Sequence, residues 1–138
     1  MLRDLARNLS NAGFRIGICD ERSEIAACFG GIAQCDLGPR TDVMDGCPKS
    51  EGMLMMLRSM APQVLAVDEI TAPEDAAALL TAAGCGAVLL ATAHGEGDGL
   101  SRRPLYRKLL EERVFQRVVT IRRTEHGRTY AVEEPEPW

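Results

Sequence analysis

The sequence predicts an α/β fold, in which a mainly parallel sheet is covered by helices on both faces. Two short apolar runs, 64–67 and 87–91, are typical of strands that are buried on both sides of a sheet. A helix is predicted between them, and parallel strands need such a crossover because a tight turn cannot join them. The chain has 138 residues, 46% of them hydrophobic and 26% charged, which is enough for one domain with a single core.

In the first half of the chain we expect a helix, a strand, a long loop and a second helix. Apolar residues recur at helical spacing over 2–9, and residues 14–19 are expected to form a short strand before a polar cluster. The segment 25–47 contains four glycines and Pro39 and is expected to be mostly loop. The second helix begins at Pro48, and its methionines recur at a spacing typical of core packing.

The second half continues the alternation of helices and strands. A helix over 73–83, which begins at a proline and is closed by a glycine, lies between the two buried strands. After a glycine-rich loop, a helix over 104–112 precedes a strand over 117–122. That strand is expected to pair with a last strand around Tyr130 through a turn at 126–127.

The composition argues against several classes of protein. The net charge of −4 does not suit a chain that grips nucleic acid over its whole surface. Nine of the 16 basic residues lie between Arg102 and Arg128, but only Tyr106 and Phe115 are interleaved with them, which is poor support for base stacking. The five cysteines form no CxxC pair, so we expect reduced thiols in the cytoplasm and no zinc site. No apolar run is long enough to predict a membrane span, and no signal peptide is expected.

Polar residues follow three successive predicted strands. Carboxyl ends of parallel strands meet at one edge of a sheet, and ligands of open parallel sheets bind beyond that edge. Three polar clusters at the same edge are a stronger signal than one, so we expect a single site there. These residues are Asp20, Glu21 and Glu24, then Asp68 and Glu69, then Thr92 and His94.

An apolar strand followed by Asp-Glu is the pattern of a Walker B strand. The aspartate of such a strand holds the Mg²⁺ that bridges phosphates, and the glutamate can polarise an attacking water. Asp68 and Glu69 fit these roles, while Thr92 and His94 could form hydrogen bonds with the terminal phosphate. Two simpler alternatives stay open, namely that Glu69 only caps the next turn and that His94 is a hydrogen-bonded loop histidine.

Six segments, in the same order, closely resemble the stage III sporulation protein AA family. Members of this family are RecA-like ATPases that are similar to the motor ATPases of type II and type IV secretion. The resemblance runs from Leu2 to about Tyr130, nearly the whole chain. The segments that carry it are 20–27, 40–43, 47–53, 57–62, 67–70 and 92–95.

The resemblance implies ATP and Mg²⁺ as cofactors and assigns roles to particular residues. Residues 20–24 correspond to the acidic box of secretion ATPases, 68–69 to Walker B and 92–95 to the histidine box. By resemblance, the catalytic residues are Glu69, Glu24 and His94, the nucleotide contacts are Asp20, Glu21, Thr92, Arg40 and Arg58, and Asp68 holds Mg²⁺ through water. An arginine of a neighbouring subunit often completes the site in ring ATPases, and Arg22, Arg40 and Arg58 are the candidates.

The resemblance also implies partners and a location. Family members energise or assemble the channel between mother cell and forespore. We therefore expect a homo-oligomeric ring that meets membrane proteins of the sporulation channel. Its location would be cytoplasmic, on the mother-cell side, and peripheral to the membrane through those partners.

Two departures from the family pattern qualify these expectations. The segment 71–73 is Thr-Ala-Pro where the family commonly has a glycine and often an arginine nearby. No GxxxxGK[ST] loop occurs in the sequence, although the family has an N-terminal domain and such a loop directly before the stretch that matches Leu2. Backbone amides and a lysine of that loop supply most of the affinity for triphosphate. Neither Lys49 nor Lys108 is placed to substitute for that lysine, so we expect weak ATP binding and little or no hydrolysis by the isolated chain.

The expected architecture is a RecA-like P-loop NTPase core without its first strand and P-loop. Residues 1–132 would form this partial ATPase domain, and the acidic, proline-containing tail 133–138 would be disordered. The strands around Leu89 and Val119 would lose their shared neighbour and must pair directly, leave a gap or recruit another chain. The alternative to an ATPase core portion is a non-hydrolysing pseudo-ATPase or ring-assembly module.

Overall fold

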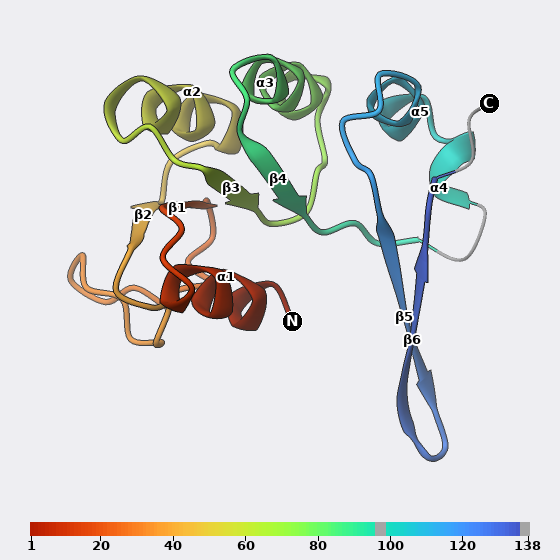
Figure 1. Ribbon diagram of the computed structural model, residues 1–138, viewed down its shortest axis with the longest axis horizontal. Helices are drawn as coiled ribbons and strands as arrows, with labels where there is room; N and C mark the ends of the chain where they lie inside the picture. Colours follow the sequence, from red (N-terminus) through yellow and green to blue (C-terminus); the bar gives the residue numbers. More distant parts are fainter. Residues whose placement is uncertain (96–98, 136–138) are drawn as a thin grey trace. The chain divides into compact units, whose positions relative to one another are not determined.

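A computed structural model describes residues 1–95 and 99–135, which divide into two compact units, Met1–His94 and Gly95–Trp138. The first unit alternates helices and strands in the order predicted, with one strand more than expected (Figure 1). Its elements are α1 (Leu2–Asn11), β1 (Ile16–Asp20), β2 (Thr41–Asp45), α2 (Lys49–Ser59), β3 (Val64–Val67), α3 (Pro73–Gly84) and β4 (Val88–Ala91).

The first unit is built on a parallel four-stranded sheet with the order β2-β1-β3-β4. Helix α1 lies on one face of this sheet, while α2 and α3 lie side by side on the other (Figure 1). The predicted parallel sheet with helices on both faces is therefore confirmed. Because the four strands are parallel, their carboxyl ends lie at one edge of the sheet. The polar residues predicted for the site lie at this edge, at the ends of β1, β3 and β4.

The two faces of β1 meet different partners because successive side chains of a strand point to opposite sides. Ile16 and Ile18 belong to the core cluster that includes Ala6 of α1. On the other face, a Cβ at Gly17 would lie 3.1 Å from the Cε atom of Met56, a tight contact that would require this methionine to shift. The predicted methionine core is confirmed for Met56, which is fully buried.

The expectation that 25–47 is mostly loop is wrong for β2, which occupies Thr41–Asp45 and pairs in parallel with β1. Aspartate is depleted in strands, and this segment contains two. As an edge strand β2 needs a hydrogen-bonded neighbour on one side only, and Asp42 and Asp45 are exposed. Strand β1 also ends one residue later than expected, so that Asp20 belongs to the strand itself.

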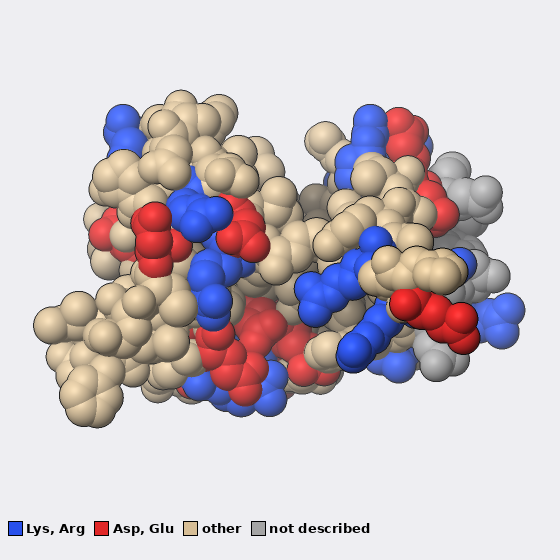
Figure 2. All heavy atoms as spheres, turned by 90° about the horizontal axis from the view of Figure 1, so that it is seen from below, with Lys and Arg blue, Asp and Glu red and all other residues tan. Residues whose placement is uncertain are grey.

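Residues 26–35 form an uncharged part of the loop between β1 and β2. Phe29 and Ile32 form an isolated antiparallel bridge there, and their side chains are 81% and 68% exposed. On the face seen in Figure 2, a lobe of the first unit shows no charged side chain, in the place that this loop occupies in Figure 1. The segment is apolar on the surface, in contrast to the charged turn that follows β1.

The second unit contains two helices and a hairpin. These are α4 (Gly99–Arg102), α5 (Pro104–Glu111), β5 (Val118–Thr124) and β6 (Gly127–Glu133). The hairpin is antiparallel, and its turn consists of Glu125 and His126 before Gly127, which has φ +123°. Strand β5 pairs with β6 in a sheet of two strands. Glu133 still belongs to β6, while 136–138 of the predicted tail lie outside the described residues.

In the described ranges of both units, no helix has the length and apolar character needed to cross a membrane.

Candidate functional site

The turn after β1 folds around the carboxylate of Asp20. This side chain is fully buried, and its two oxygens accept hydrogen bonds from the backbone amides of Glu24, Ile25 and Ala26 at 2.8–3.2 Å. Such bonds compensate the cost of burying a carboxylate. The oxygens of Asp20, which was expected to contact nucleotide, are therefore occupied by the hydrogen bonds that shape the turn. The neighbouring residues 21–24 lie at the surface of this sheet edge.

Arg22 lies at the centre of the polar cluster on this edge. Its Nη2 atom is 3.4 Å from an oxygen of Glu69, 3.7 Å from one of Glu24 and 3.9 Å from one of Asp68. The three carboxylates come from the ends of β1 and β3, which are neighbours in the sheet. The structure thus brings together three of the predicted site residues around a guanidinium group that was not assigned to the same site.

The ends of β3 and β4 are tied to each other by Asp68 and Thr92. The hydroxyl of Thr92 donates a hydrogen bond of 2.9 Å to Asp68, and the backbone amide of Ile70 donates one of 3.3 Å to the carbonyl of Thr92. Partial burial would raise the pKa of Asp68, but hydrogen bonds from the Glu69 backbone and Thr92, with the positive charge of Arg22, outweigh it. The pKa of Asp68 therefore lies below its ordinary value of 3.8, and the carboxylate is kept ionised.

A second ion pair fixes Glu21 on the same edge. The Nζ atom of Lys49, in the first turn of α2, lies 3.0 Å from a carboxylate oxygen of Glu21. The lysine side chain is only 6% exposed, and the ion pair compensates part of the cost of burying its ammonium group. The hydroxyl of Ser23 donates a hydrogen bond to Asp45 at the end of β2. These contacts connect the turn after β1 to the beginning of α2 and the end of β2.

The remaining predicted residues lie in two places. His94 follows Thr92 at the same edge and is exposed. The backbone of Arg40 accepts a hydrogen bond from the amide of Ile16, at the amino end of β1. Arg58 lies in the last turn of α2, just before the chain enters the amino end of β3. Arg40 and Arg58 are therefore at the opposite edge of the sheet from Asp68.

Two cations of the site were not predicted for it from the sequence. Arg22 was considered only as an arginine that could act on a neighbouring subunit, and Lys49 only as a poor substitute for a P-loop lysine. The signal for Arg22 was its position among Glu21, Ser23 and Glu24 after β1. The signal for Lys49 was the proline before it, which places its side chain in the first turn of a helix that follows β2.

The donor set at this edge suits a cation held through water. In the parts of the chain that the structure describes, no group of three or more His, Cys, Asp or Glu side chains is arranged to hold a metal ion directly. Asp68 offers an ionised carboxylate that is 25% exposed, which is the kind of oxygen donor that Mg²⁺ uses while keeping several of its waters. The predicted role of Asp68 as a ligand through water is compatible with this geometry.

Thr92→Val is expected to raise the pKa of Asp68, because it removes the 2.9 Å hydrogen bond that favours the ionised form. In the wild type, a folded-state pKa below 3.8 means that Asp68 stabilises the fold above that pH and loses this contribution as the pH falls through the folded value. The variant should therefore lose less stability on acidification in this range.

Side-chain carboxyl resonances followed by NMR during a pH titration measure the effect of Thr92→Val directly. Thr81→Val is the matched control, since its hydroxyl donates to the carbonyl of Ala77 on the surface of α3. An Asp68 titration that is the same in both variants and the wild type would contradict the role given to Thr92.

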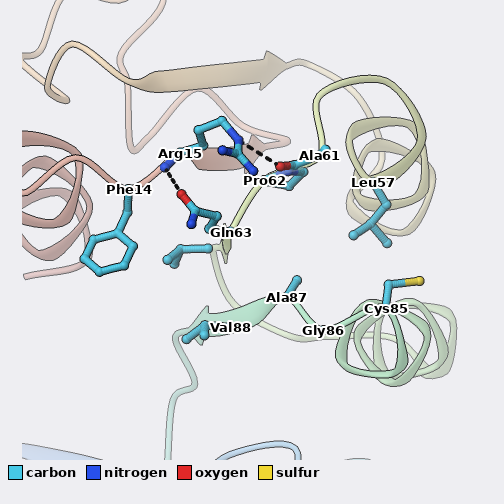
Figure 3. A pocket seen from close by; sticks show the side chains of 11 residues that line it. Phe14, Arg15, Leu57, Ala61, Pro62, Gln63, Cys85, Gly86, Ala87 and Val88 are labelled. Atoms are coloured by element: carbon cyan, nitrogen blue, oxygen red, sulfur yellow. Dashed lines mark hydrogen bonds between the residues drawn. The ribbon is translucent and has the colours of Figure 1, made fainter.

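A hollow of about 490 Å³ lies at the opposite edge of the sheet (Figure 3). In it, the amide of Arg15 donates to the side-chain oxygen of Gln63, and the Arg15 guanidinium donates to the carbonyl of Ala61. Its lining is made by the amino ends of β1, β3 and β4 with the last turns of α2 and α3. It contains none of the residues predicted for the site.

Comparisons with known proteins relate this arrangement to sporulation proteins. A family model described as "Sporulation stage III, protein AA" matches residues 1–133. The chain is 48% identical over 130 residues to Stage III sporulation protein AA of Bacillus subtilis (strain 168), covering 89% of the chain and 42% of that protein. The chain therefore spans less than half the length of this curated relative.

Among solved structures, the chain is similar to the Legionella pneumophila ATPase DotB. The TM-score is 0.60 with 15% sequence identity, and the similarity covers 96% of the chain and 39% of that protein. At this level of identity, the likeness concerns the fold.

Proposed function

The chain belongs to the Sporulation stage III, protein AA family, and from that premise we propose that it is the magnesium-binding and water-handling portion of an ATP-hydrolysing sporulation protein. The observation that carries the proposal is the junction of Asp68, Glu69 and Thr92, at the ends of two adjacent parallel strands. Its ATPase-like fold gives this junction a context in which nucleotides bind.

Each side chain of the junction has a task in this proposal. Asp68 is ionised and would hold Mg²⁺ through water, and the metal would supply positive charge opposite the phosphates. Glu69 follows it and would orient the attacking water and take its proton. Thr92 keeps Asp68 in place and, with His94, would form hydrogen bonds with the terminal phosphate. Glu24 lies near Glu69 through Arg22 and would assist it.

The chain alone offers only part of a nucleotide site. A loop of the GxxxxGK[ST] type is not in the 138 residues, and Lys49 is held by Glu21. Hence we expect weak binding of ATP and no steady hydrolysis by the isolated chain. Asp20 is closed within its turn, so nucleotide contacts of the acidic box would fall to Glu21.

Arg40 and Arg58 suit contacts with another copy of the protein. Both side chains are exposed at the edge of the sheet opposite the one that carries Asp68. Within one chain they therefore cannot belong to the same site as Asp68. In a ring, the amino edge of one subunit could face the site of the next subunit. Arg40 or Arg58 would then complete the site of that neighbouring subunit. The ring would act at the mother-cell side of the sporulation channel, through membrane-protein partners of that channel.

A chimera tests the proposed function. In it, this chain replaces the aligned segment of the Bacillus subtilis relative, to which it is 48% identical. The purified chimera should hydrolyse ATP, and Glu69→Gln should lower its turnover about 100-fold, as loss of a general base does. Glu74→Gln, an exposed glutamate in the first turn of α3, is the matched control and should leave turnover unchanged.

A second candidate is a non-hydrolysing module for ring assembly, for which the exposed Arg40 and Arg58 at the amino edge of the sheet could serve as contacts. Spore formation by cells that carry only the chimera separates the two. If the chimera supports sporulation and Glu69→Gln supports it equally well without hydrolysis, the assembly function is correct and the hydrolytic one is wrong.

A further inference from the structure

Arg22 is shared by three carboxylates and docked closely on none of them. Its distances to Glu69, Glu24 and Asp68 are 3.4, 3.7 and 3.9 Å. A guanidinium that forms a strong charge-assisted hydrogen bond lies about 2.7–2.9 Å from its acceptor. The side chain of Arg22 is also 55% exposed, so water can replace each of these contacts. The contacts are of a kind that can be broken at little cost.

We propose that Arg22 is a displaceable counter-cation, which partly neutralises the Walker B carboxylates until Mg²⁺ takes its place. The inference rests on the proposed function, because it concerns the same cation-holding edge. Arg22 is then a positioning residue that keeps Asp68 and Glu69 near each other while the metal is absent, and its departure accompanies metal binding.

The charge of the cluster supports a competition between cations. Three carboxylates and one guanidinium leave a formal charge of −2 around Arg22. Without the arginine the same atoms would carry −3. A divalent cation therefore finds more attraction when the guanidinium is gone, and the two cations repel each other when both are present.

The turn that carries Arg22 does not depend on this side chain for its shape. Asp20 holds the backbone amides of residues 24–26 from inside the fold. Ser23 is anchored to Asp45. Because these contacts are separate from the Arg22 guanidinium, it can swing away from the carboxylates while the backbone of the turn stays in place.

Binding of Mn²⁺ to the 138-residue chain, without nucleotide, tests the proposal. Mn²⁺ is a paramagnetic substitute for Mg²⁺, and the signal of unbound Mn²⁺ in electron paramagnetic resonance gives the bound fraction. Arg22→Gln should bind Mn²⁺ about tenfold more tightly than the wild type, which corresponds to roughly 1.4 kcal/mol. Arg22→Lys keeps the charge and should restore an affinity close to that of the wild type.

Arg7→Gln is the matched control. It removes an arginine from an ion pair with Asp4 on α1, in the same unit but outside the cluster, and should leave Mn²⁺ affinity unchanged. Equal or weaker Mn²⁺ binding by Arg22→Gln would overturn the proposal. So would a tenfold gain in Arg7→Gln, because the effect would then reflect net charge alone.

A measurement on the wild type covers the case in which Arg22→Gln does not fold. In a ¹⁵N NMR titration with Mg²⁺ at constant ionic strength, the side-chain Nε resonance of Arg22 should move, and that of Arg7 should not. An Arg22 resonance that stays fixed would overturn the proposal. Both experiments omit nucleotide, so their results do not depend on ATP hydrolysis. A chimera that hydrolyses no ATP would contradict the proposed function without changing these results.

Discussion

Asp20→Asn is expected to lower the free energy of unfolding by about 3 kcal/mol, because it disrupts a buried set of hydrogen bonds. The carboxylate of Asp20 is fully buried and accepts from the amides of Glu24, Ile25 and Ala26 through both oxygens. Asparagine keeps the shape but has one acceptor oxygen, and its NH₂ group would face a backbone N–H. At least one buried donor is then left without an acceptor, which costs about 1–3 kcal/mol of stability. The remaining hydrogen bonds are weaker because their acceptor is no longer charged.

Unfolding in urea, followed by circular dichroism, measures the effect of Asp20→Asn. Asp42→Asn makes the same chemical change on the neighbouring strand β2, where the side chain is exposed, and should stay within about 0.5 kcal/mol of the wild type. If both variants unfold at the same urea concentration, the buried hydrogen bonds of Asp20 do not hold the turn. The account of this residue as a structural carboxylate would then fail.

Much of the fold was predictable because the buried strands carry an unusual local pattern. The run 64–67 is apolar at every position, which only a strand covered on both faces tolerates, and β3 has this range. The polar residues after it were expected at one edge with those after β4, and the 2.9 Å bond between Thr92 and Asp68 confirms that proximity. The catalytic roles of these residues remain predictions.

Strand β2 could not be recognised in the sequence, because its own residues do not favour a strand. Its stability comes from pairing with β1, a segment that is distant in sequence, and such pairing leaves little trace in local composition. The same is true of side-chain partners. The salt bridge between Lys49 and Glu21 depends on α2 starting beside the turn after β1, which only the folded arrangement of β1 and β2 decides.

The same distinction between local pattern and long-range contact explains which predicted site residues lie where they were expected. Those that directly follow strands of the sheet were placed correctly, since a parallel sheet fixes where strand ends lie. Arg40 and Arg58 were assigned by resemblance alone, and the fold puts both at the amino edge. Asp20 was expected to follow the strand, although it is the last residue inside it. Its role as a nucleotide contact was also assigned by resemblance, and the structure shows its carboxylate buried in the turn after β1.

Gly38→Ala is expected to lower the free energy of unfolding by about 3 kcal/mol, through the combined effects of strain and overlap. Gly38 has φ +88°, a conformation that disfavours any residue with a Cβ atom. A Cβ there would lie 2.5 Å from the Cβ and 2.6 Å from the Oγ of Ser10. Ser10 is 1% exposed and its Oγ accepts a 2.7 Å bond from the amide of Arg40, so it cannot move aside without losing that bond.

Two further variants separate overlap from strain at Gly38. Gly31→Ala introduces the same atom at φ +79° with nothing within 4 Å, and should cost only the backbone strain, about 1 kcal/mol. Ser10→Gly removes the two closest atoms that the new Cβ would meet and leaves the backbone oxygen of Arg7, at 3.1 Å. Urea unfolding of Gly38→Ala should therefore show a smaller additional loss in the Ser10→Gly background than in the wild type. Equal losses in both backgrounds would mean that α1 and the loop before β2 do not meet at Ser10, and that the amino edge that carries Arg40 is held in place by other contacts.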